Sequence, residues 1–245
     1  MNVVFYHNGV ELPPYLDTFT AAVRQQMPTA RIIHLTDETT PGCETADEVR
    51  RLSCPWPTKP VNSNTITAIG HYYLSICDIP DMLFAEPDML FAAPMDDLMA
   101  GECDVTIARR PAYDRISASY RRLYPYNSFI IAKTPQFYKD VWTQMLRFRR
   151  VRGSINMEAV GRVVNSGKYT IRFLDGETYN ARPRRYSPAI KVYHFRIGAR
   201  KETAMAAFYK AHIAKGTIVS DTRSNPVVST YATNPAVVRF GKAAR

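Results

Sequence analysis

The sequence has no apolar run near the roughly 18 residues that a transmembrane helix needs, which argues against a chain built on membrane-spanning helices. Its first residues lack the basic start and longer apolar core of a signal peptide, so we expect a cytoplasmic protein. The four cysteines show no close metal-type spacing, which predicts reduced, structural thiols. What is present is 245 residues, 46% of them apolar, enough for one large or two small domains.

Acidic residues are scarce after the first hundred positions. Residues 1–100 hold 5 Lys/Arg and 13 Asp/Glu, a net charge of −8, whereas residues 101–245 hold 27 and 9, a net charge of +18. This uneven charge indicates a polyanionic partner: nucleic acid, an anionic membrane or glycan, or a diphosphate-bearing substrate. A solvated basic face explains the same charge, so composition does not choose among these partners.

The most informative stretch is residues 81–91, where acidic side chains separate two apolar runs. Residues 82–85 have the pattern of a strand buried on both faces. Glu86 and Asp88 follow, separated by Pro87, whose fixed φ favours a turn. Burying an unpaired carboxylate costs several kcal/mol, so we expect both acids at a strand end, facing a cation or a cleft. Such oxygen ligands suit Mg²⁺ or Mn²⁺; a solvated corner is the alternative.

Hydrophobic periodicity predicts alternating strands and helices along most of the chain. One long polar segment, residues 36–60, is predicted as a loop with at most one helical turn. We expect strands over residues 3–6, 31–35, 82–85, 103–108, 127–131, 169–174 and 191–194, and helices over 13–27, 64–77, 134–148, 155–164 and 202–215.

A second stretch, residues 191–201, places a histidine, a glycine and a lysine after an apolar run. His194 ends an apolar strand, and Gly198 and Lys201 follow it. A lone histidine at a strand end is usually structural, but this combination, about a hundred residues after Glu86 and Asp88, is harder to attribute to chance. Imidazole together with carboxylates suits Mn²⁺.

Together the two stretches resemble the GT-A glycosyltransferases, most of all the glycogenin-like and lipopolysaccharide galactosyltransferase-like enzymes. These enzymes move a sugar from a nucleotide-sugar to an acceptor. The resemblance covers roughly residues 1–201 and implies an α/β, GT-A fold with a mostly parallel central sheet flanked by helices. Residues 202–245 would then form a C-terminal helix and a basic tail or small subdomain packed on the catalytic domain.

The resemblance implies a metal and diphosphate site. Glu86, Asp88 and His194 would hold Mn²⁺ (or Mg²⁺) between the two phosphates of the donor, and Gly198 and Lys201 would bind the diphosphate. The chain departs from the family twice: Glu86 replaces the first Asp, and the gap from His194 to Gly198 is one residue longer than usual. Whether Glu86 binds the metal therefore stays open.

The resemblance also suggests where the rest of the donor would bind. The end of the first strand holds the nucleobase in the family, which makes Tyr6, His7 and Asn8 candidates, although Asn8 also fits a simple turn. A polar or basic residue at the start of the helix over residues 64–77 would reach the donor phosphates. Lys59, Asn62 and Asn64 lie in that region, and the spacing does not select one of them.

Three further side chains are candidates for orienting the sugar and the acceptor. Asn127 begins a segment that resembles the family's Asn-Ser-Gly-Val strand, with Phe129 in place of the glycine. Asn156 and Glu158 stand where family members carry an Asp-Gln pair, so one of them would supply that function. Glu177-Thr178-Tyr179-Asn180 resembles the family's Tyr-Asn near the acceptor cleft.

The function implied is a metal-dependent glycosyltransferase, with retention of configuration; an inverting enzyme would need Glu158 or Asp175 as its base. The acceptor would be polyanionic, either a modified base in DNA or an envelope glycan with the basic face on an anionic membrane. The alternative is a non-catalytic nucleic-acid-binding protein on a degenerate GT-A scaffold. A metal-dependent nuclease is less expected, because no further acidic cluster is present.

Overall fold

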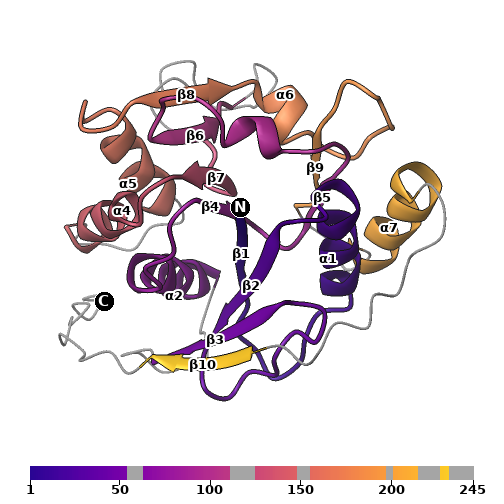
Figure 1. Ribbon diagram of the computed structural model, residues 1–245, viewed down its shortest axis with the longest axis horizontal. Helices are drawn as coiled ribbons and strands as arrows, with labels where there is room; N and C mark the ends of the chain where they lie inside the picture. Colours follow the sequence, from indigo (N-terminus) through magenta and orange to yellow (C-terminus); the bar gives the residue numbers. More distant parts are fainter. Residues whose placement is uncertain (54–62, 111–124, 148–154, 197–200, 215–226, 232–245) are drawn as a thin grey trace, which may run out of the picture.

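A computed structural model of the chain describes residues 1–53, 63–110, 125–147, 155–196, 201–214 and 227–231. Its main feature is an eight-stranded sheet in the order β10-β3-β2-β1-β4-β7-β6-β8, which runs from bottom to top in Figure 1. All neighbouring strands are parallel except β7, which is antiparallel to both β4 and β6. The strands are β1 (Asn2–Tyr6), β2 (Arg31–Thr36), β3 (Glu48–Leu52), β4 (Met82–Ala85), β6 (Val105–Ala108), β7 (Phe129–Ala132), β8 (Ile171–Leu174) and β10 (Val227–Tyr231).

Helices cover both faces of this sheet, as parallel strands joined by crossovers require (Figure 1). One face carries α1 (Tyr15–Gln26) and α7 (Lys201–Phe208), and the other carries α2 (Ser63–Ile76), α4 (Gln136–Leu146) and α5 (Ile155–Val164). Two apolar cores result, because successive strand side chains point to opposite faces: Val3 and Phe5 enter the α1 core, and Val4 enters the α2 core. The mostly parallel α/β architecture expected from the sequence is confirmed. Among the described helices, none has the length and apolarity to cross a membrane.

A small second sheet lies beside the end of β4. It pairs β5 (Met89–Phe91) with β9 (Val192–His194) in antiparallel register, with Met89 opposite His194 and Phe91 opposite Val192. Its apolar side chains belong to the same core as α1. A short helix, α6 (Gly176–Tyr179), and a 3-10 turn, Asp96–Leu98, complete this part of the chain.

The loop predicted over residues 36–60 is wrong over Glu48–Leu52, which forms β3 beside β2. Its charged residues interrupt the apolar pattern expected of a strand, but two of them pair with each other in the structure. Glu48 is buried and forms ion pairs with Arg50 at 2.5 Å and with Arg31, on the neighbouring strand, at 2.8 Å. Val49 and Leu52 supply the buried apolar side chains that a strand needs.

The C-terminal helical segment, residues 201–213, packs on the apolar core beside α1. Met205, Tyr209 and Ile213, on α7 and the π-helical turn Tyr209–Ile213 that continues it, are buried in the α1 core. The hydroxyl of Tyr209 donates to Gln25 Oε1 at 3.0 Å, and Gln25 Nε2 donates to the Ile213 carbonyl at 2.6 Å. Further on, β10 adds a parallel edge strand to β3.

Candidate metal centre

A tight turn after β4 places the two acids. Glu86 N donates to the Ser128 carbonyl at 3.0 Å, and Met89 N donates to the Glu86 carbonyl at 3.1 Å. The second bond closes a four-residue turn with Pro87 at its second position, where its φ is favourable, and the first ties the turn to the segment before β7. The turn that the sequence predicted between Glu86 and Asp88 is confirmed.

Pairing of β9 with β5 brings in the histidine. His194 lies opposite Met89, and Phe195 N donates to the Asp88 carbonyl at 2.9 Å, which extends the pairing past the strand end. Residues more than a hundred positions apart thus become neighbours because two short strands share a ladder. The acidic turn follows β4 and His194 is the last residue of β9, so two apolar strands fix where these side chains start.

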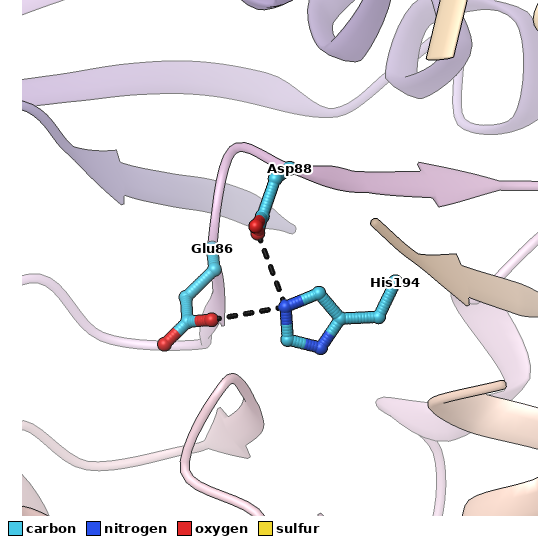
Figure 2. Close-up of side chains that lie close together, drawn as sticks. All are labelled: Glu86, Asp88 and His194. Atoms are coloured by element: carbon cyan, nitrogen blue, oxygen red, sulfur yellow. Dashed lines mark ion pairs between the residues drawn. The ribbon is translucent and has the colours of Figure 1, made fainter. Parts of the chain in front are cut away.

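Figure 2 shows the three side chains converging. Glu86 Oε2 and Asp88 Oδ1 each lie 3.2 Å from His194 Nε2. One ligand atom from each residue lies within 4.8 Å of the others. The side chain of Glu86 is 30% exposed, whereas Asp88 and His194 are 9% and 6% exposed, so the cluster opens to solvent on the side of Glu86.

The electrostatics of this cluster demand a positive charge. Burial alone would lower the pKa of His194, but hydrogen bonds to Asp88 and Glu86 outweigh it and raise the pKa above its ordinary value. Burial also raises the pKa of Tyr6 far above its usual range, and the charges of Glu86 and Asp88 raise it further. A proton on His194 or a divalent cation among the three side chains would each supply the missing charge.

The far side of the imidazole is held by Asn180, which is fully buried. Asn180 Nδ2 donates to Ser128 Oγ at 2.8 Å, which assigns its Oδ1 as the acceptor 2.9 Å from His194 Nδ1. With the Nδ1 proton donated to Asn180, neutral His194 presents the Nε2 lone pair to the carboxylates. Two carboxylates and an oriented imidazole are a donor set that fits Mn²⁺ or Mg²⁺.

Arg196 also contacts this outer side of His194. Its Nη2 donates to Asn180 Oδ1 at 2.6 Å and to the Asn180 carbonyl at 3.2 Å, and its Nε–H points at His194 Nδ1 from 3.2 Å. The guanidinium lies over the ring of Tyr126, 4.3 Å from the ring centroid. Nothing in our sequence analysis assigned a role to Arg196, and Asn180 was noted there only for its place beside Tyr179 in a family motif.

The predicted nucleobase residues lie at the end of β1. The ring of Tyr6 stacks on Phe84 with centroids 5.6 Å apart, and its hydroxyl forms a hydrogen bond with the side chain of Thr67. His7 Nε2 contacts the Glu11 carbonyl at 3.0 Å, and burial lowers the pKa of His7. Asn8 is buried, and within the described part of the chain its Oδ1 has no hydrogen-bond partner.

The residues predicted to orient sugar and acceptor differ in their surroundings. Asn127 is buried on the loop before β7, directly before Ser128. Asn156 and Glu158 lie in the first half of α5, where Glu158 pairs with Arg162 at 2.9 Å. Asp175 caps α6 by accepting from the backbone N–H groups of Glu177 and Thr178, which gives this candidate base a structural role.

Four of the predicted donor-binding residues cannot be placed as side chains. Lys59 and Gly198 lie outside the described residues. Asn64 is the second residue of α2 and Lys201 the first residue of α7, and only their backbone is described. Most of the arginine- and tyrosine-rich segment, residues 113–126, is also outside the described part, although Tyr126 itself is buried.

No protein-family model matches the chain, and no curated protein sequence is similar to it. Solved structures are similar. The glycosyltransferase GlyE of Streptococcus pneumoniae TIGR4 aligns with a TM-score of 0.56 and 8% identity, over 86% of this chain and 64% of GlyE. The galactosyltransferase LgtC, in complex with donor and acceptor sugar analogs, aligns with a TM-score of 0.57 and 11% identity, over 88% of this chain and 98% of LgtC. At such identities the likeness shows the fold alone, and that fold is the glycosyltransferase fold expected from the sequence.

Proposed function

We propose that the chain is a metal-dependent glycosyltransferase that takes its sugar from a nucleotide-diphosphate donor. One observation carries this proposal: Glu86, Asp88 and His194 converge at the carboxyl end of a central strand, where open α/β sheets bind ligands. The same fold occurs in GlyE and in LgtC, whose structure holds donor and acceptor sugar analogs. A structural ion-pair cluster would not need two carboxylates aimed at one nitrogen.

The three side chains would hold Mn²⁺ or Mg²⁺, and the bound metal would neutralise charge on the leaving nucleoside diphosphate. The remaining roles belong to this chain's own groups. Asn8 offers a buried acceptor, Oδ1, that an N–H of the nucleobase would satisfy. We propose that Tyr6 and His7 also bind the nucleobase of the donor.

Further residues complete the proposed site. Lys59, Asn64, Gly198 and Lys201 would bind the diphosphate, and Asn127 would orient the sugar. Asn156 or Glu158 would contact the acceptor, and we propose that transfer occurs with retention of configuration. Asp175 is less suited to act as a base, because its carboxylate already caps α6.

Thermal melting tests the donor site. Melting curves are measured with Mn²⁺ and a panel of nucleoside diphosphates on the wild type, on Asp88→Asn and on Asp97→Asn, a matched change at an exposed acid outside the cluster. A diphosphate at a hundred times its Kd stabilises the native state by about 2.7 kcal/mol. We expect one diphosphate to stabilise the wild type and Asp97→Asn only with metal, and Asp88→Asn to lose the effect. No stabilisation by any diphosphate would contradict the proposal.

The acceptor we propose is polyanionic, a modified base in DNA or an envelope glycan, with a basic face that would also suit peripheral contact with an anionic membrane. The net charge of +18 over residues 101–245 supports it. Binding of DNA that weakens steeply with salt, in the absence of any effect of diphosphates, would favour the alternative of a non-catalytic nucleic-acid-binding protein.

A further inference from the structure

We propose that Arg196 weakens the binding of the metal alone and makes tight metal binding depend on the nucleoside diphosphate. Arg196 would act as a positioning residue through His194, rather than by touching the metal. This inference rests on the proposed function, because it takes Glu86, Asp88 and His194 as the metal ligands.

The geometry places a fixed positive charge directly behind a metal-binding histidine. Arg196 Nε lies 3.2 Å from His194 Nδ1, and its Nη2 lies 2.6 Å from Asn180 Oδ1, the same oxygen that contacts Nδ1. The Tyr126 ring, 4.3 Å away, holds the guanidinium plane in place. Among the described residues, no carboxylate forms an ion pair with Arg196, so none of them neutralises its charge.

This arrangement reverses the usual support of a metal-bound histidine. Such a histidine commonly donates its second N–H to a carboxylate or carbonyl, which raises the basicity of the nitrogen that binds the metal. In this chain the acceptor is the neutral amide of Asn180, and a cation shares it. The Nε–H of Arg196 lies 3.2 Å from Nδ1, on the side of the imidazole away from the two carboxylates. A dication bound at Nε2 would therefore lie close to the guanidinium cation, and this repulsion opposes the metal-bound form.

The charge balance explains the link to the diphosphate. The carboxylates of Glu86 and Asp88 cancel a bound divalent cation, and Arg196 then leaves the centre with a net charge of about +1. A nucleoside diphosphate brings negative charge to such a centre. This charge would compensate the excess positive charge that otherwise weakens metal binding. Metal and diphosphate should therefore strengthen each other's binding, by the same factor in each direction.

The test measures Mn²⁺ dissociation constants, with and without a nucleoside diphosphate, from the electron paramagnetic resonance signal of free Mn²⁺. The variants are Arg196→Met, which removes the charge, and Arg196→Lys, which keeps it; Arg184→Met removes a charge from an exposed position as the matched control. We expect Arg196→Met to bind Mn²⁺ alone about tenfold more tightly, the lower end of the effects known for partners of metal-bound histidines. The enhancement by diphosphate should fall by a similar factor, while Arg196→Lys and Arg184→Met should resemble the wild type.

Damage to the structure would weaken metal binding, so tighter binding is the diagnostic direction. Asn180→Asp gives an independent variant, since it places a carboxylate between His194 Nδ1 and Arg196; it too should tighten Mn²⁺ binding, even if Arg196→Met fails to fold. Equal or weaker Mn²⁺ binding by both variants overturns this inference and leaves the proposed function standing. A wild type that binds no Mn²⁺, with or without diphosphate, overturns the metal assignment in the proposed function and this inference with it.

Discussion

Asn180 illustrates how much of the proposed metal centre depends on a residue that is not one of its proposed ligands. Its amide joins His194 to Ser128 and is fully buried. Replacing it with Leu removes the acceptor of the Nδ1 proton and frees the imidazole to turn. We expect Asn180→Leu to weaken Mn²⁺ binding by about 10- to 100-fold. Titration of Mn²⁺ against the variant and against Asn165→Leu, a change at the far end of α5, checks this; equal affinities would contradict it.

His71 gives a second prediction at the residue scale, on acid stability. It is buried on α2, burial lowers its pKa to about 4, and within the described part of the chain neither ring nitrogen has a hydrogen-bond partner. Below pH 6.5 the unfolded chain takes up a proton that the native state refuses, so stability falls as the pH falls from about 6.5 toward 4.

Between pH 7 and pH 5 the free energy of unfolding of the wild type should fall because of His71. We expect this fall to be about 2 kcal/mol smaller in His71→Leu. Because no hydrogen bond is lost, the variant should be at least as stable as the wild type at pH 7. Urea denaturation at the two pH values measures both effects. An unchanged pH dependence would show that His71 is protonated in the native state.

The sequence predicted the ligands of the proposed centre but not the residues that support them. Glu86 and Asp88 stand out because acids rarely interrupt apolar sequence, and His194 ends an apolar strand at a suitable distance along the chain. Asn180 and Arg196 carry no such signal, since their roles come only from contacts with His194 that the β5–β9 pairing and α6 create. Spacing identifies groups that share one strand or turn; it does not identify groups that meet after folding.

At the scale of elements, β3 is one of the strands that periodicity failed to predict, together with β5 and β10. Its pattern was hidden because Glu48 and Arg50 are buried as a pair, with Arg31 of β2 on the other side of the carboxylate. Removing one partner of a buried pair leaves the other charge uncompensated. We expect Glu48→Ala to lower the free energy of unfolding by about 3 kcal/mol. Urea denaturation checks this against Glu44→Ala, an exposed acid before the strand, which should change little.

The contact between α2 and β1 is tight enough to require glycine. A Cβ added at Gly70 would lie 2.1 Å from Cζ of Tyr6, whose ring is already stacked on Phe84. Inside a helix, alanine is otherwise favoured over glycine by about 1 kcal/mol. The sign of the change in unfolding free energy for Gly70→Ala therefore shows whether helix propensity or the clash with Tyr6 is larger. We expect net destabilisation of about 1–3 kcal/mol, because moving the ring would disturb its stacking on Phe84 and its hydrogen bond with Thr67.

A double-mutant cycle with Tyr6→Leu separates this clash from other causes. Once the Tyr6 ring is gone, Gly70→Ala should cost little or become stabilising. Unfolding free energies of the four proteins give the coupling. Additive effects would mean that the Tyr6 ring is not what excludes a side chain at Gly70.

At the scale of the whole molecule, the two apolar cores are separated by one sheet, and the metal centre lies where β4 leaves that sheet. The α/β class was predictable because apolar runs and helical stripes alternate along the chain. The register of the small β5–β9 sheet was not, since three-residue strands carry too few side chains to specify a partner. The part of the site that depends on this sheet could therefore be predicted only through the family resemblance.

The C-terminal segment offers a test of how far this unit extends. Met205 is fully buried against α1, and Tyr209 and Ile213 join it through the hydrogen bonds to Gln25. If the segment is part of one cooperative unit, Met205→Ala should lower the midpoint of a single unfolding transition and cost about 2–5 kcal/mol. An independent subdomain would instead unfold separately, and the variant would shift only one of two transitions. Urea denaturation followed by far-ultraviolet circular dichroism and by tyrosine and tryptophan fluorescence distinguishes the two. Coincident curves, shifted together by the substitution, would show that residues on α7 stabilise the same fold that holds Glu86, Asp88 and His194.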